Sequence, residues 1–371
     1  MIARPAATDV IVVGGGPIGL AIAWRLLHVG RTVTVVEADE PEAAWRVSAG
    51  MLSPPIEADY GQAELSLLSV AALADYPAFL AELEAESGIA THYARVGSLA
   101  VALDRDQLEA LRRRFELLRD ERQLAVAWLP GSECRELEPL LSPRVSAGIH
   151  AADDAQVDPR RLVGALRVAI ARRGGILHDA RVDGLELAGG RVVGVRVGDE
   201  GLAAGTVVLA AGAWMGSLGA QAAALRIRPV KGQILRLQTS AWPSMLVETE
   251  HIYAFRRPSG EVVLGATVEE QGFRPGVTAG GIFELLDEGL RTVPGMREWT
   301  LEEPGMGFRP AAPDNAPVIG ELAPGLVAAG GHYRSGILLT WSTAEAICQL
   351  VERGALPELV APFAPDRLGL P

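Results

Sequence analysis

The chain has 371 residues, of which 49% are hydrophobic and 22% charged, a balance typical of folded globular proteins. This length exceeds what one ordinary core fills, so we expect two domains or one large α/β unit with an insertion. The net charge of −12 argues against nucleic acid or an anionic membrane as partner, because both attract basic surfaces.

No segment has eighteen consecutive apolar residues without a charged residue or a helix breaker, so we expect no membrane span. The two cysteines, Cys134 and Cys348, show no metal-ligand spacing, so we expect no metal site and a reducing, cytoplasmic setting. The partners that remain are small molecules.

The first forty residues predict a strand, a helix and a second buried strand, at 9–13, 18–29 and 32–36. Between strand and helix, Gly14, Gly16 and Gly19 fit G-x-G-x-x-G. In order, these glycines permit a tight turn, let the backbone approach a pyrophosphate, and let helix and strand pack closely.

Glu37 ends the second strand, where a carboxylate accepts hydrogen bonds from the adenosine ribose and disfavours a 2′-phosphate. The sequence therefore predicts a dinucleotide site that excludes NADP. FAD is favoured over NAD for two reasons. The α/β alternation is interrupted for about a hundred residues after the second strand, whereas an NAD dehydrogenase usually continues it directly. A second glycine-containing strand end at 206–214 could then contact FAD, which is the longer ligand.

Further elements follow in chain order. Residues 60–145 read as mostly helical, with a strand at 96–103; Asp158, Pro159 and Gly174 then delimit a helix. The remaining predictions are a hairpin through 188–190, strands between 229 and 270, and helices at 280–292 and 335–351.

The α/β signals lie at both ends and in the middle of the chain. We therefore expect a discontinuous, Rossmann-like FAD-binding domain and a sheet-based α+β domain that binds substrate. The predicted boundaries are 1–60, 145–220 and 305–371 for the first domain, and 61–144 and 221–304 for the second.

Several motifs occur in a familiar order, among them "SAGML", "VVLAAGAWMG", "HIYAFRR", "GFRPAAPDNAPVIG" and "AAGGHYRSGILLTWSTA". Together they resemble the D-amino-acid oxidase superfamily of flavoproteins, most closely the glycine oxidases of bacterial thiazole (thiamine) biosynthesis. The resemblance runs from Asp9 to about Cys348 and implies non-covalent FAD and, as a family expectation, a homo-oligomer.

The resemblance also implies site residues. Arg309 of the G-F-R-P motif would bind the substrate carboxylate, Tyr253 would assist it with His251 nearby, and Arg334 would lie at the active-site rim. Further residues expected to contact the cofactor are Pro17, Ile18, Ala38, Ser48, Ala49, Gly50, Met51, Val182, Ala211, Gly212, Trp214, Gly331, His332, Tyr333, Arg334, Ser335, Gly336 and Ile337.

The residue types suit this chemistry. A buried substrate carboxylate requires a paired cation, and the planar fork of arginine binds it bidentately. This favours a substrate-binding role for Arg309 over the alternative, a surface salt bridge. Tyr253 is either a substrate contact or a core tyrosine. His251, two residues away and so expected on the same strand face, is either a proton acceptor for the substrate ammonium or structural.

A helix beginning near Ser335 would direct its N–H groups at the pyrimidine end of the flavin, where negative charge develops on reduction. Arg334 would add positive potential at the same end of the flavin and reach toward an anionic substrate. The alternative is that Arg334 pairs with a neighbouring acid.

The expected reaction moves the Cα hydrogen of glycine, or of another small amine or D-amino acid, with two electrons to flavin N5. With water and O2 it gives an oxo acid, ammonia or amine, and hydrogen peroxide. Two alternatives stay open: a dehydrogenase with a non-oxygen acceptor, and a nucleotide-binding scaffold. Val268 stands where the family often has methionine, and Arg46 and Val47 replace small residues, so substrate preference stays open.

Overall fold

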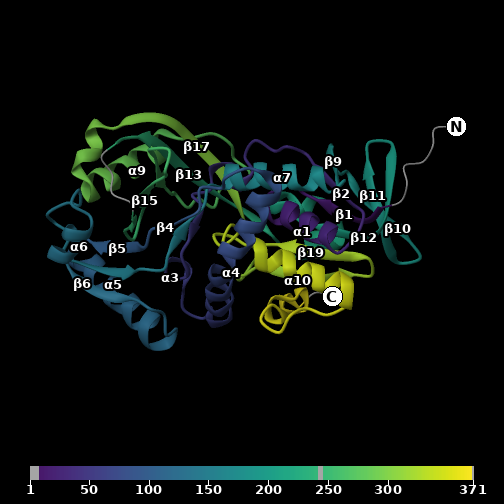
Figure 1. Ribbon diagram of the computed structural model, residues 1–371, viewed down its shortest axis with the longest axis horizontal. Helices are drawn as coiled ribbons and strands as arrows, with labels where there is room; N and C mark the ends of the chain where they lie inside the picture. Colours follow the sequence, from purple (N-terminus) through teal and green to yellow (C-terminus); the bar gives the residue numbers. More distant parts are fainter. Residues whose placement is uncertain (1–7, 241–244, 370–371) are drawn as a thin grey trace.

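The computed structural model describes residues 8–240 and 245–369. Two large sheets lie side by side along the long axis of the molecule (Figure 1). The first runs in the order β10-β11-β12-β1-β2-β9, with β19 also beside β12 and β18 beside β19. Its strands are β1 (Thr8–Val13), β2 (Val33–Glu37), β9 (Ile176–Asp179), β10 (Gly184–Ala188), β11 (Arg191–Val197), β12 (Glu200–Leu209), β18 (Val318–Ala323) and β19 (Leu326–Gly330).

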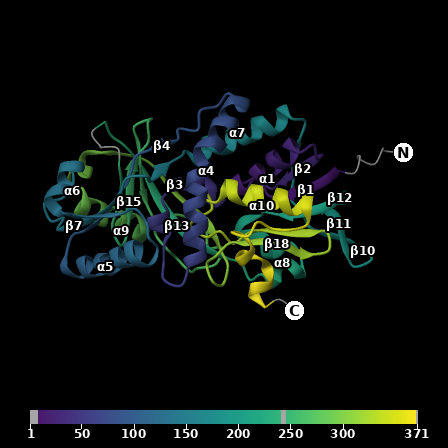
Figure 2. The same cartoon turned by 60° about the horizontal axis from the view of Figure 1, so that its bottom comes forward.

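The central strands β1, β2, β9, β12 and β19 are parallel, which confirms the predicted α/β class. Helices α1 (Pro17–His28), α4 (Ala63–Ser87), α7 (Pro159–Arg172) and α10 (Thr340–Arg353) pack on one face of this sheet (Figure 2). Trp24 of α1 is fully buried among them, with its ring 5.8 Å from those of Phe79 and Trp341. Helices distant in the sequence therefore share one core.

The second sheet runs in the order β17-β13-β16-β15-β14-β5-β7-β6. Helices α5 (Arg105–Glu116) and α9 (Ala279–Thr292) pack their apolar sides against it. Its strands are β5 (Ser98–Ala102), β6 (Ala127–Pro130), β7 (Ala147–Ala151), β13 (Arg228–Gln238), β14 (Leu246–Glu248), β15 (Tyr253–Arg256), β16 (Glu261–Gly265) and β17 (Thr300–Ala311). A small sheet, β3-β8-β4, joins Met51–Leu52, Ala155–Gln156 and Ala94–Arg95.

The structure adds three details to the predicted layout. Strand β6 (Ala127–Pro130) interrupts the region 60–145, which was expected to be mostly helical. The second sheet includes β7 (Ala147–Ala151) and residues 305–311 of β17, which the boundaries at 145 and 305 placed in the FAD-binding domain. Helix α10 begins at Thr340 rather than near Ser335. The domain boundaries themselves stay a proposal.

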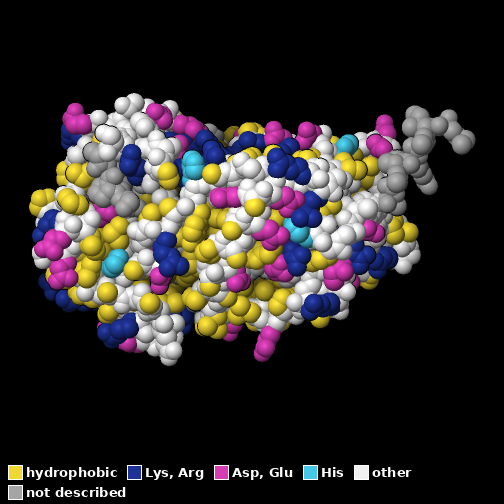
Figure 3. All heavy atoms as spheres, viewed as in Figure 1, with side chains coloured by type: hydrophobic (Ala, Val, Ile, Leu, Met, Phe, Trp, Pro, Cys, Tyr) yellow, Lys and Arg dark blue, Asp and Glu magenta, His cyan; other side chains and the backbone are white. Residues whose placement is uncertain are grey.

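Helix α4 is long and apolar enough to cross a membrane by length and composition alone, which the sequence reading did not anticipate. Its Leu68, Tyr76 and Phe79 are buried against α1, α7 and α10, as in the core of a globular domain. On the face shown in Figure 3, Lys and Arg side chains are interspersed with Asp and Glu, in keeping with the net charge of −12.

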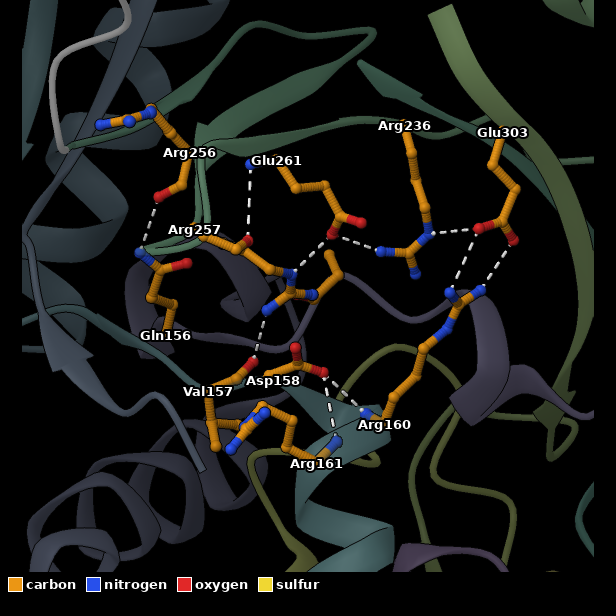
Figure 4. Close-up of polar contacts among 12 residues, drawn as sticks. Gln156, Val157, Asp158, Arg160, Arg161, Arg236, Arg256, Arg257, Glu261 and Glu303 are labelled. Carbon is orange, nitrogen blue, oxygen red and sulfur yellow. Dashed lines mark hydrogen bonds and ion pairs between the residues drawn. The ribbon is translucent and has the colours of Figure 1, made fainter. Parts of the chain in front are cut away.

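A network of arginines and carboxylates joins the second sheet to helix α7 and to residues 156–158, which precede this helix (Figure 4). Arg257, 2% exposed, donates to Glu261 Oε1 at 3.1 Å and to the carbonyls of Val157 and Ala49 at 3.0 and 2.7 Å. Glu261 also accepts from Arg236 at 2.5 Å. Buried cations require such partners, because each unpaired one would retain a large desolvation cost. Arg257 thereby ties the second sheet to segments of the first domain.

The junction depends on buried rather than exposed ion pairs. We expect Arg257→Met to lower the free energy of unfolding by about 3–5 kcal/mol, because two carbonyls and Glu261 lose their partner in the interior. Arg160→Met, which breaks a half-exposed pair with Glu303 at 2.7 Å, should cost no more than about 1 kcal/mol. Urea unfolding followed by circular dichroism measures both, and equal losses would contradict this assignment.

Candidate functional site

A large cavity opens where the carboxyl ends of β1, β2, β12 and β19 face the second sheet. The empty space between these elements is about 1670 Å³, a value that includes space open to solvent. In parallel α/β sheets, ligands bind in the crevice outside the carboxyl ends of the strands. The cavity therefore has the position of a dinucleotide site.

The glycine-rich turn after β1 forms the first wall. Gly14 has φ +116°, and a side chain there would collide with the Ala210 carbonyl; a side chain at Gly19 would collide with the Gly14 carbonyl. These two glycines are required for the turn and the helix to pack. A Cβ on Gly16 would meet nothing closer than Trp45, at 3.5 Å, although Gly16 lines the cavity. Gly16 is thus the glycine whose bareness suits an approaching phosphate.

Glu37 lies at the edge of the cavity beyond this turn, at the end of β2. Its Oε2 accepts a hydrogen bond from the Gly15 N–H. Burial raises the pKa of Glu37, and the hydrogen bonds from the Gly15 and Asp39 N–H groups oppose this effect. An acceptor so placed at the second strand end suits the hydroxyl groups of an adenosine ribose.

Most of the predicted cofactor residues line this cavity. They are Gly14, Gly16, Pro17, Ile18, Glu37, Ala38, Ser48, Ala49, Gly50, Met51, Val182, Ala211, Gly212, Trp214, His332, Tyr333, Arg334, Gly336 and Ile337. Gly19, Gly331 and Ser335 do not line it. Other cavity residues were not predicted from the sequence, among them the segment 43–45, Ala180, Ser217 and Phe308. Trp45 follows two alanines, and no motif marks this segment.

The turn after β19 differs from the expected helix start. Tyr333 has φ +48°, and residues 333–339 form turns, with the Leu339 N–H donating to the Ser335 carbonyl at 2.9 Å. His332 is buried with Nε2 2.9 Å from Thr343 Oγ1, and burial lowers its pKa to about 3. His332 is therefore neutral and directs its ring at α10. The expected dipole of a helix beginning near Ser335 is absent from this position.

Arg309 and Tyr253 meet at the opposite end of the cavity. Arg309 Nη1 donates to the Thr267 carbonyl at 3.0 Å and, at 3.4 Å, to that of Lys231. Its guanidinium lies over Gly232, where a side chain would collide with it. Tyr253 covers Gly265 in the same way, and burial raises the pKa of its phenol. Among residues 8–240 and 245–369, no carboxylate lies within ion-pair distance of Arg309, so the alternative of a surface salt bridge is not observed.

Arg334 lines the same end but has an acidic neighbour, Glu57, with Nε to Oε2 at 3.9 Å. Glu57 ends α3 (Pro54–Glu57), and burial raises its pKa. A second ion pair lies nearby, in which Arg114 Nη1 is 3.0 Å from Glu248 Oε2. The sequence reading allowed an acid beside Arg334 without identifying it. The only available signal was an acid shortly after "SAGML" in an otherwise apolar stretch.

Three other residues lie away from the cavity. His251 is exposed and precedes β15, so it does not share a strand face with Tyr253 as expected; the Thr249 hydroxyl instead accepts from the His251 and Ile252 N–H groups in a turn. Val268 is 58% exposed. Lys231 is fully buried with Nζ 3.5 Å from Glu269 Oε2.

The parallel sheet, the glycine turn and the cavity at the strand ends together define a protein of the dinucleotide-binding class. The family model described as "DAO: FAD dependent oxidoreductase" matches residues 9–350, and the chain belongs to this family. The protein is therefore an FAD-dependent oxidoreductase, and the cavity described above is suited to FAD by its glycine turn and its Glu37 acceptor.

Individual relatives extend this assignment. The chain is 34% identical over 362 residues to the bifunctional protein ThiO/ThiG of Trichormus variabilis, covering 96% of this chain but only 54% of that relative, so it spans about half the relative's length. It is 32% identical over 375 residues to glycine oxidase of Geobacillus kaustophilus, covering 97% of each.

Solved structures of oxidases share the fold of this chain. Glycine oxidase from Geobacillus kaustophilus superposes with a TM-score of 0.89 at 30% identity, covering 96% of this chain and 98% of that one. Iminodiacetate oxidase from Chelativorans sp. BNC1 superposes with a TM-score of 0.85 at 29% identity, covering 96% and 99%.

The roles of the three glycines can be separated. We expect Gly16→Ala to fold normally but to bind FAD about tenfold or more weakly, because its Cβ would occupy the approach path of the pyrophosphate while making only an ordinary contact with Trp45. Gly164→Ala, at a position on α7 with open space around it, is the matched control and should retain FAD. Flavin fluorescence during titration of the apoprotein measures both. An unchanged affinity in the Gly16 variant would contradict the assignment.

Proposed function

We propose that this enzyme oxidises glycine, or another small amine or D-amino acid, to the imine, which water hydrolyses to an oxo acid and ammonia or amine. FAD, when bound, accepts the Cα hydrogen together with two electrons, and O2 then takes the electrons to give hydrogen peroxide. The support comes from one observation above all: Arg309 faces the cavity with its donors unpaired by any carboxylate of the described chain.

The protein groups hold the substrate and exclude water. The fork of Arg309 is positioned by the Thr267 and Lys231 carbonyls and matches the geometry of a carboxylate. Tyr253 adds a hydroxyl beside it that burial keeps protonated, since its pKa is raised. Orienting a substrate in this way lowers the entropic part of the barrier. His251 is too exposed to contribute, and the proposal therefore includes no histidine base.

The wider setting belongs to the same proposal. Relatives named glycine oxidase match over nearly their whole length, which supports a small amino-acid substrate. The similarity to the bifunctional protein ThiO/ThiG supports a place in thiazole (thiamine) biosynthesis. Non-covalent FAD, a cytoplasmic location and self-association complete it. Cys134 and Cys348 are buried free thiols that do not line the cavity, which supports the first two points.

The test is an absorbance spectrum of the purified enzyme under anaerobic addition of glycine. Flavin bands that bleach with glycine and return in air support the proposal. Bands that bleach and stay reduced in air identify a dehydrogenase instead. Bands that no small amine or amino acid bleaches contradict the proposed substrate class.

The carboxylate contact can be tested separately. We expect Arg309→Met to lower kcat/KM for glycine about 30-fold or more, mostly through KM, because a charge-assisted pair in a desolvated site is lost. Arg228→Met is the control: Arg228 lies on the neighbouring strand β13 but pairs with Glu270 outside the cavity, so kcat/KM should stay within about twofold. Steady-state kinetics on flavin-loaded enzymes decide, and equal effects of the two substitutions would contradict the role of Arg309.

A further inference from the structure

The cavity carries three arginines, and two of them lie beside acids. Arg181 is bonded to Glu40 at the nucleotide end, and Arg334 lies 3.9 Å from Glu57 at the substrate end. Arg309 donates its hydrogen bonds only to carbonyls among the described residues, so it is the cavity arginine without an acid at ion-pair distance. The substrate end is thus arranged for one negative charge, although it contains two guanidinium groups.

Glu57 is the acid that balances the charge of Arg334, whereas Arg309 has no such partner among the described residues. The Glu57 side chain is only 11% exposed, and it lines the cavity beside Arg334, close enough to Tyr253 for its charge to act on the phenol. The charged groups that act on it are Arg334, Arg309 and Arg114, with Glu248 as the opposing acid. Because Glu248 is bonded to Arg114, Glu57 is the counter-ion left for Arg334.

We propose that Glu57 sets the charge of the substrate, by pairing with Arg334 so that only compounds with a single carboxylate, bound at Arg309, are accepted. This inference rests on the proposed function. A second carboxylate on the substrate would have to displace Glu57 from Arg334 and then lie next to it. Like charges brought together in a poorly solvated site are strongly disfavoured, and such a repulsive element is an effective way to reject a related ligand.

Glu57→Gln tests the proposal, because glutamine keeps the shape of the side chain and removes its charge. The substrates compared are sarcosine and iminodiacetate, both N-substituted glycines that differ by the second carboxylate. We expect the ratio of kcat/KM for iminodiacetate to that for sarcosine to rise about tenfold or more in this variant. Binding of malonate relative to acetate, read from flavin absorbance without turnover, should shift in the same direction.

Two controls define the mechanism. Asp59→Asn removes an exposed carboxylate that also acts on Arg334, and both ratios should stay within about twofold, because water screens that charge. In the double variant Glu57→Gln with Arg334→Met, the gain for iminodiacetate and malonate should disappear, since it operates through Arg334.

Unchanged ratios in Glu57→Gln, with FAD retained, would overturn the proposal. A large loss of activity on both substrates at an unchanged ratio would also overturn it, and would indicate that Glu57 accepts a proton instead. If the wild-type enzyme oxidises no amine or amino acid, the proposed function fails, but the acetate and malonate titrations still decide the role of Glu57.

Discussion

The site depends on backbone segments approaching more closely than any side chain would allow. Gly14 meets the Ala210 carbonyl, so that the carboxyl ends of β1 and β12 close over one end of the cavity. The same constraint recurs at the other end, where Gly232 and Gly265 leave room for Arg309 and Tyr253. Bare backbone thus lies at both ends of the cavity, in the glycine turn at one end and beneath Arg309 and Tyr253 at the other.

The buried arginines complete this arrangement by fixing the segment between the two sheets. Arg257 holds the Ala49 carbonyl from the second sheet, and the Arg46 carbonyl accepts from Arg160 and Arg236. The segment 45–51, in which every residue except Arg46 lines the cavity, is therefore held through its backbone rather than by apolar packing alone. Directed hydrogen bonds suit a segment that faces an open cavity and has little surface to bury.

The sequence was sufficient where local rules determine structure. Apolar runs and glycine spacing predicted β1, α1, β2 and the dinucleotide turn, and capping residues predicted α7. It failed where a single residue changes the local path. The left-handed Tyr333 delays α10 to Thr340, and the Thr249 hydroxyl turns the chain before β15, which moves His251 outward.

Tertiary contacts were beyond the reach of any local pattern. Glu57 and Arg334 are far apart in the sequence, and Arg257 meets Ala49 across the junction of the sheets. The identity of Arg309 as a site residue came from its motif and agrees with its place in the cavity, whereas its lack of an acidic partner became visible only in the structure.

The order of strands in the first sheet also bears on how the chain is synthesised. Strand β12 receives its parallel neighbour β19 from residues 326–330, and Trp24 of α1 is covered by Trp341 of α10. The amino-terminal βαβ unit therefore emerges from the ribosome long before its last partners exist. Its apolar surface stays uncovered until residues 326–341 have been made, and exposed apolar surface of this kind favours aggregation of a nascent chain.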